Sequence, residues 1–240
     1  MEKKKTVIIT GASKGIGAAL VQAFLTRDYN VVANSLNISD TKPSTRPDLE
    51  VISGDIGLRK TAEAVAGCAI SKFGSIDHVV NNAGIFSSRP FTDYGEDEFQ
   101  RFVSTNLCGF IFITQLAVKQ MIVQGTGGSV TTITAALADN PIVGVPASLP
   151  MITKGGLNAV TLSLANEYAK DNIRFNAVAP GVVDTPMHQG DDQARMKSLN
   201  PMSILAETQD IAEAVVYLTE ARYVTGEVLH VDGGAHVGKW

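Results

Sequence analysis

The chain has 240 residues, of which 45% are hydrophobic and 18% charged, and its formal net charge at pH 7 is -4. This is the composition of an ordinary globular protein, and the slight acidity argues against nucleic acid or an anionic membrane as a partner. No run reaches the roughly 18 uninterrupted apolar residues of a membrane span, and the two cysteines, Cys68 and Cys108, are too few for a disulfide framework, so we expect a reducing compartment, the cytoplasm.

Short β-branched runs alternate with helical patterns along the whole chain. Strands are predicted at 6–10, 30–35, 49–55, 76–84, 127–134, 173–181 and 227–234, and helices at 15–28, 59–74, about 95–123, about 150–170 and 208–221. Strands that alternate with long helices indicate parallel βαβ units, and nearly continuous apolar strands indicate a sheet covered on both faces. We therefore expect an α/β fold, a single doubly wound Rossmann-type domain over residues 1–240 with a seven-stranded parallel sheet. The polar segment 37–48 is predicted to be a loop.

The stretch "TGASKGIG" (10–17) follows the first strand and opens the first helix. Gly11 permits the tight turn, Gly15 lets the backbone approach a pyrophosphate, and Gly17 lets helix and strand pack closely. The helix N-terminus then offers unpaired N–H groups and the positive end of its dipole to phosphates. The placement of this turn between a strand and a helix predicts a nucleotide-binding site.

The glycine spacing resembles that of the short-chain dehydrogenase/reductase family, and the resemblance continues through "GDI" (54–56), "NNAG" (81–84), "STNLCG" (104–109), "NAVAPGVVDTPM" (176–187) and "VTGEVLHVDGG" (224–234). It implies that Asp55 receives the adenine amino group, that 82–84 pass beside the adenine ribose, and that Thr185 holds the carboxamide of a nicotinamide. The full set of cofactor-binding residues implied is Gly11, Ser13, Lys14, Gly15, Ile16, Gly17, Ser35, Asp55, Ile56, Asn82, Ala83, Gly84, Lys154, Pro180, Gly181, Val183 and Thr185.

The choice of cofactor depends on the end of the second strand. An acidic residue there would bind the ribose diol of NAD, and a basic one would accept the 2′-phosphate of NADP. Residues 34–37 are Asn, Ser, Leu and Asn, so neither is present. Without an acidic residue no carboxylate repels the 2′-phosphate, and Ser35 and Asn37 can donate hydrogen bonds to it. Lys14 is similar to a lysine that helps to bind the cofactor in NADP-preferring relatives. We expect NADP rather than NAD.

The resemblance implies four catalytic residues, of which this chain keeps two. Lys154 matches the lysine that binds the nicotinamide ribose, and Asn106 matches the helix-kinking asparagine that steadies a proton-relay water. Pro150 stands in the position of the proton-donating tyrosine, and Ala135 (Leu137 by a second count) in that of the serine. A positioned general acid contributes about 10²–10⁴-fold and an oxyanion donor about 10²–10³-fold, so ordinary ketone reduction should be slow. Proline is tolerated in the first turn of a helix, so the fold should survive.

Other side chains could supply the proton. Thr134 is expected to point to the other face of its strand, Ser148 to cap a helix and Asp139 to be solvated. His188 lies in the loop that usually covers the pocket in the family and is the candidate acid, with a surface histidine as the alternative. The remaining histidines and the cysteines lack metal-ligand spacing, so we expect no metal.

Three functions remain open. The first is an atypical oxidoreductase that binds NADP(H) and passes hydride to a small molecule needing little acid assistance. The second is a non-catalytic NAD(P)-binding regulatory or assembly protein, and the third is elimination or isomerisation with the cofactor bound only structurally. The helices at 95–123 and 150–170 are apolar over more than one stripe, and the resemblance implies a homotetramer or a dimer formed through them.

Overall fold

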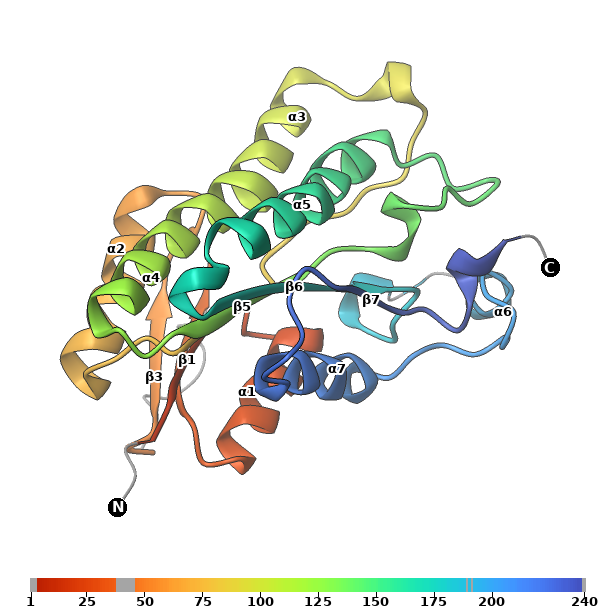
Figure 1. Ribbon diagram of the computed structural model, residues 1–240. Coiled ribbons are helices and arrows are strands. Elements are labelled where there is room, and N and C mark those ends of the chain that lie inside the picture. Colours follow the sequence, from red (N-terminus) through yellow and green to blue (C-terminus); the bar gives the residue numbers. More distant parts are fainter. Residues whose placement is uncertain (1–3, 38–45, 189, 191, 239–240) are drawn as a thin grey trace.

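The computed structural model describes residues 4–37, 46–188, 190 and 192–238. Its centre is one seven-stranded sheet in which every pair of neighbouring strands is parallel, in the order β3-β2-β1-β4-β5-β6-β7 (Figure 1). The strands are β1 (Thr6–Thr10), β2 (Asn30–Ser35), β3 (Leu49–Ser53), β4 (His78–Asn81), β5 (Gly128–Ile133), β6 (Ile173–Pro180) and β7 (Val228–Val231). The strand order reverses direction between β1 and β4, which creates a crevice at the carboxyl ends of these two strands.

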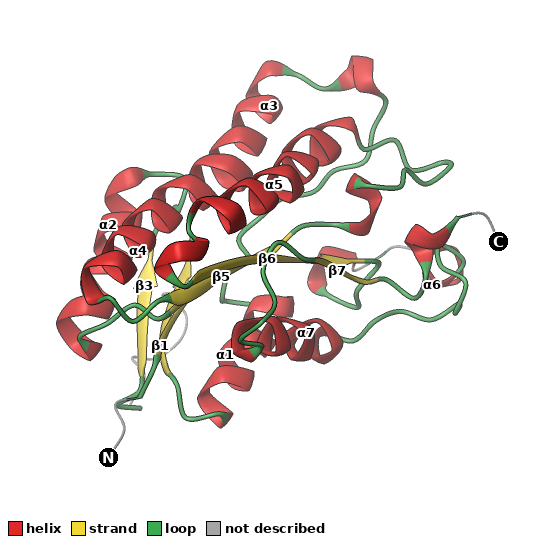
Figure 2. Cartoon of the chain, viewed as in Figure 1, coloured by secondary structure: helices red, strands yellow, loops and turns green. Residues whose placement is uncertain are grey.

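Helices cover both faces of the sheet, as Figures 1 and 2 show. One face carries α1 (Gly15–Thr26) and α7 (Thr208–Glu220), which also pack against each other. The other face carries α2 (Arg59–Cys68), α4 (Gly109–Gln124) and α5 (Ser148–Glu167), and α3 (Glu96–Phe102) leads into α4. The predicted doubly wound α/β fold is therefore confirmed.

Two apolar layers lie between the sheet and its helices. Leu20, Phe24 and Val215 are fully buried on the α1–α7 side, and Ile113 and Phe175 are buried on the other. The residues of β1 alternate between the two layers, so both faces of the strand must be apolar. This double burial explains why the strands form continuous hydrophobic runs rather than alternating ones.

Several element ends differ from the sequence prediction. Residues 82–84 leave the β-ladder directly after Asn81 and form the strap that faces the crevice. The helices predicted at 59–74 and 95–123 each contain a π-helical segment, Ala69–Phe73 and Val103–Cys108. The short helix α6 (Gln193–Lys197) was not predicted. Most of the loop predicted at 37–48 lies outside the described residues.

The continuous helical stretch Glu96–Gln124 is long and apolar enough to cross a membrane by length and composition, with a mean hydropathy of 1.4. In the fold it packs against α2, α5 and β4. The apolar window is 44% buried inside the molecule, while Ile111, Ile122 and Val123 are exposed. That the chain has no membrane span stays an expectation.

Candidate functional site

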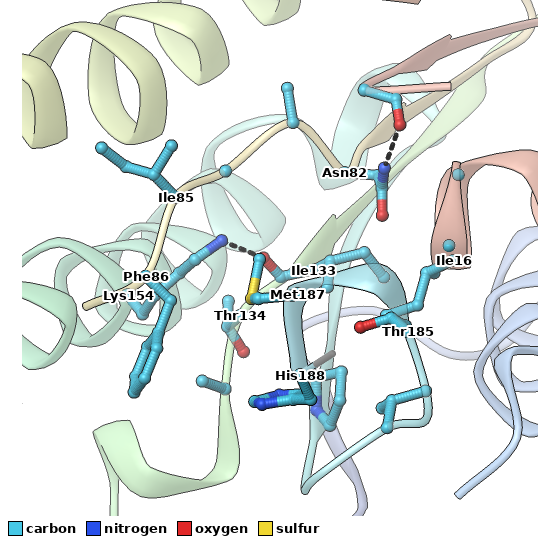
Figure 3. Close-up of a pocket in the computed structure, with 18 of the residues that line it drawn as sticks. Ile16, Asn82, Ile85, Phe86, Ile133, Thr134, Lys154, Thr185, Met187 and His188 are labelled. Carbon is cyan, nitrogen blue, oxygen red and sulfur yellow. Dashed lines mark hydrogen bonds between the residues drawn. The ribbon is translucent and has the colours of Figure 1, made fainter. Parts of the chain in front are cut away.

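A cavity of about 950 Å³ opens at the carboxyl ends of the central strands, where the strand order reverses. The glycine turn after β1, the strap after β4, the end of β5 and the segment after β6 line it (Figure 3). The structure brings all the residues predicted to bind the cofactor to this one surface: Gly11, Ser13, Lys14, Gly15, Ile16, Gly17, Ser35, Asp55, Ile56, Asn82, Ala83, Gly84, Lys154, Pro180, Gly181, Val183 and Thr185. That they contact a cofactor stays a prediction.

The glycine turn is locked by its own backbone. A Cβ atom on Gly17 would lie 2.1 Å from the carbonyl oxygen of Gly11, and one on Gly11 would lie 2.8 Å from the Cα of Ala83. The amide of Asn82 donates to Gly11 O at 3.0 Å and closes the turn. Helix α1 starts directly after the turn and none of the described side chains caps it. Its first N–H groups therefore face the cavity without a competing acceptor, which is the arrangement that binds phosphate.

The end of β2 shows which groups could meet the adenosine ribose. The hydroxyl oxygens of Ser13 and Ser35 lie 2.8 Å apart, so two hydroxyls are presented together there. Asn34 is engaged elsewhere, because its amide donates to the carbonyl oxygens of Ile52 and Gly54. The sequence analysis named Ser35 and not Asn34 as a donor to the cofactor, and the hydrogen bonds of Asn34 agree with that choice.

Lys154 projects from α5 into the cavity next to the end of β5 (Figure 3). Its ammonium nitrogen donates to the carbonyl oxygen of Ile133 at 2.7 Å. A Cβ atom on Gly84 would lie 2.9 Å from the same nitrogen, so a larger residue there would displace the ammonium group. Burial lowers the pKa of Lys154 from 10.5 to about 8, because the charged form loses its hydration. The lysine is thus held as a single positioned cation at the centre of the cavity.

Asn106 lies in the π-helical segment Val103–Cys108, which interrupts the regular α-helix between α3 and α4. Its side chain is buried, accepts the N–H of Ile85 at 2.9 Å, and donates to Ile85 O and to the hydroxyl of Thr153. Asn106 does not belong to the described lining of the cavity. The side chain clamps the strap beneath Gly84 rather than facing substrate, so any effect on a relay water is indirect.

The two positions that the resemblance assigns to tyrosine and serine differ in their surroundings. Ala135 lines the cavity directly after β5, as does Leu137. Pro150 is the third residue of α5 and is buried; it is absent from the described lining of the cavity. At this place in the first turn a backbone N–H has no acceptor within the helix, so proline fits without loss of a hydrogen bond.

The other hydroxyl and acid candidates differ in whether they reach the cavity. The Thr134 hydroxyl donates to Val178 O on β6 at 3.3 Å, although the residue does line the cavity. Ser148 is the first residue of α5 rather than its cap, since Ala147 holds the cap position. His188 lines the cavity on the short turn Pro186–His188, and in Figure 3 its ring points toward the end of β5 that carries Thr134.

Asp139 is exposed, as the sequence suggested, but its carboxylate is also engaged by two side chains. It accepts from the amide of Asn158 at 2.9 Å and from His230 at 3.1 Å. The ring of His230 stacks on His236 with centroids 4.0 Å apart, and His236 donates to Asp232. This chain of contacts fastens the C-terminal segment to the loop after β5. No group of ligands suited to a metal ion occurs among the described residues.

With this geometry established, comparison with known proteins identifies the family. The family model described as Enoyl-(Acyl carrier protein) reductase matches residues 11–236. The chain belongs to the short-chain dehydrogenase/reductase family. It is 36% identical over 253 residues to a 3alpha-hydroxysteroid dehydrogenase of Mediterraneibacter gnavus, with 98% of each chain covered.

Solved structures of this family superpose closely on the chain. A 3-ketoacyl-(acyl-carrier-protein) reductase from Brucella melitensis complexed with NADH has a TM-score of 0.90 and 27% identity, covering 97% of this chain and 98% of its own. ElxO with NADP bound has a TM-score of 0.90 and 29% identity, covering 98% of this chain and 100% of its own. The Mediterraneibacter gnavus relative is thus a dehydrogenase, and both of these solved structures hold a bound dinucleotide.

Proposed function

We propose that the chain is an NADP(H)-dependent oxidoreductase that exchanges hydride with a small organic substrate through a non-standard acid group. The observation that carries this proposal is the cavity, which joins a sterically locked glycine turn to a buried lysine beside β5. The bound relatives support a dinucleotide in this place, since one similar structure holds NADH and another NADP. The preference for NADP rests on the paired hydroxyls of Ser13 and Ser35 and on the lack of an acid at the end of β2.

The residues of the chain divide the work of such a reaction. The N–H groups of α1 would bind the pyrophosphate, Lys154 would hold the nicotinamide ribose, and the segment after β6 would contact the ring. When bound, the nicotinamide donates or accepts the hydride. A carbonyl that receives hydride must also gain a proton, and His188 is the group on the substrate side whose imidazole can transfer one.

The missing hydroxyl pair limits the range of substrates. Ala135 and Pro150 can neither polarise a carbonyl nor donate a proton, so unactivated ketones should react slowly. Substrates in which little negative charge develops on oxygen, such as quinones, iminium ions or activated carbonyls, should react best.

A steady-state assay tests this function. NADPH oxidation is measured with a quinone, a cyclic iminium and an activated ketone, using the wild-type chain, His188→Asn and the double variant Pro150→Tyr with Ala135→Ser. We expect the wild type to turn over at least one compound, His188→Asn to lose about tenfold or more in kcat, and the double variant to gain ketone reduction. Because tyrosine at position 150 must enter a buried site, each variant is first checked for NADPH binding and thermal unfolding.

Ala135 and Pro150 also favour a second function, a non-catalytic NAD(P)-binding regulatory or assembly protein. Such a protein would retain the glycine turn and Lys154 while it lacked both hydroxyls. Tight NADPH binding without turnover of any compound would support it and overturn the enzymatic proposal. Product formation without a net change in nicotinamide absorbance would instead indicate elimination or isomerisation.

We also propose a homotetramer, with a dimer as the alternative, formed through α4 and α5. Ile111 and Ile122 on α4 and Ile152 and Leu162 on α5 are apolar and exposed, which suits burial against a second copy. Both cysteines are free in the structure, in keeping with a cytoplasmic location. Size-exclusion chromatography with light scattering measures the assembly directly.

A further inference from the structure

The cavity extends past the position proposed for the nicotinamide, and this outer part has mainly apolar walls. They come from the strap after β4, the loop after β5 and the segment after β6 that includes α6. The apolar side chains are Phe86, Leu137, Ile142, Val145, Met187, Met196 and Leu199. Walls of this kind fit a substrate with a sizeable hydrocarbon body, because a polar body would lose its hydration without gaining hydrogen bonds.

The described lining of the cavity has more positively than negatively charged side chains. The described lining contains four cations, Lys14, Arg101, Lys154 and Arg195, and one carboxylate, Asp55, in a chain whose formal net charge is -4. Three of the cations lie on the cofactor side. Lys14 is in the glycine turn, Lys154 stands beside β5, and Arg101 is one turn from Ser104, which packs on Gly57 next to Asp55. Arg195 is the described cation of the outer, apolar part.

Arg195 links α6 to the loop after β5 and lines the cavity. Its guanidinium donates to the carbonyl oxygen of Gly144, in the loop after β5, at 3.1 Å. The neighbouring acid, Asp192, accepts the backbone N–H groups of Ala194 and Arg195 and so caps α6. A guanidinium carries five N–H donors in a planar fork, and within the described chain only one bond to its side chain is found. The rest of the fork can accept a carboxylate in the paired geometry that arginine favours.

We propose that the substrate carries a carboxylate in addition to its reacting group and its apolar body, and that Arg195 binds this carboxylate at the outer end of the cavity. The inference deepens the proposed function and rests on it, because it names the class of substrate for the same site. The reacting carbon would lie by Lys154 and His188, the body against the apolar walls, and the anion at Arg195. A charge held at one end of an apolar slot also fixes which end of the substrate faces the hydride.

Binding of a matched pair of fluorescent probes tests this assignment without requiring turnover. Dansylaminoundecanoic acid and its methyl ester share one apolar body and differ in the carboxylate. Each is titrated into the NADP+-loaded wild type, Arg195→Met and Lys197→Met. Lys197 lies on the same helix, is exposed and is absent from the described lining. Its variant therefore removes the same charge outside the cavity. Methionine keeps the apolar stem of either side chain.

We expect the wild type and Lys197→Met to bind the acid about tenfold more tightly than the ester, as for a hydrogen-bonded ion pair. In Arg195→Met the acid should weaken about tenfold while the ester is unchanged. An equal loss for both probes would overturn the proposal and leave Arg195 as a support for the Gly144 loop. Equal binding of acid and ester by the wild type would overturn it too, as would failure of both probes to bind.

The outcome is separable from that of the proposed function. If the chain binds NADPH and prefers the acid but turns over no compound, the oxidoreductase fails while the carboxylate site stands. If it turns over quinones or iminium ions without any preference for the acid, the oxidoreductase stands and the carboxylate site fails. Circular dichroism on each variant shows that the folded protein is being compared.

Discussion

The proposed nucleotide half and the proposed substrate half of the cavity are built in different ways. The nucleotide half consists mostly of backbone, in which Gly11, Gly17 and Ala83 touch so closely that a single added carbon would not fit. The substrate half consists of side chains on the long connections after β5 and β6, including Ala135 and Met187. A backbone cradle tolerates little change, whereas side chains on loops can be exchanged one at a time. Exchange of a side chain such as Ala135 or Met187 can therefore leave the glycine turn intact.

The largest expected effect on stability and cofactor affinity comes from adding a side chain to the glycine turn. Gly17→Ala places a Cβ 2.1 Å from Gly11 O and 2.7 Å from the amide nitrogen of Asn82, two atoms that hold the turn together. We expect the free energy of unfolding to fall by about 3 kcal/mol. NADP affinity should fall about a hundredfold, since the turn must move away from the pyrophosphate. Urea unfolding and calorimetric titration with NADP measure the two effects.

Gly67→Ala is the matched control for this substitution. Gly67 lies in α2 and is exposed, and a Cβ atom added there would meet no described atom within 4 Å. Alanine there should stabilise the helix by up to about 1 kcal/mol and leave NADP affinity unchanged. If both variants behaved alike, the close packing of the turn would not be what makes the nucleotide half rigid.

A smaller effect on cofactor affinity is expected from changing a side chain, rather than a glycine, in the nucleotide half. Ser35→Asp puts a carboxylate beside the Ser13 hydroxyl, where it can bind a ribose diol and repel a 2′-phosphate. The ratio of NADP to NAD affinity should shift toward NAD by about tenfold. Ser53→Asp adds the same charge at the end of β3, outside the described lining, and should change the ratio little. An unchanged ratio in Ser35→Asp would place the 2′-position elsewhere.

The sequence predicted the two halves unequally well. The fold could be predicted from the apolar runs, and many of the residues that line the cavity could be predicted from the glycine positions, because both patterns reflect main-chain geometry directly. The contacts of Asp139 did not follow, since Asn158 and His230 come from distant segments and meet only in the folded chain. Helix α6, with Arg195, was missed because five residues carry no clear periodicity. Long-range side-chain contacts of this kind require the structure.

The smallest effect concerns the lysine between the two halves. Burial lowers the pKa of Lys154 from 10.5 to about 8, so above pH 8 the folded chain loses a proton that the unfolded chain keeps. The free energy of unfolding should therefore rise between about pH 8 and 10.5, and this rise should be absent in Lys154→Met. NADP affinity should do the opposite and weaken above pH 8, because the charged ammonium is the better donor to the ribose and attracts the anionic cofactor. Lys119→Met, an exposed charge on α4, should retain both trends. Identical pH profiles for Lys154→Met and the wild type would mean that the buried ammonium does not link cofactor binding to proton uptake.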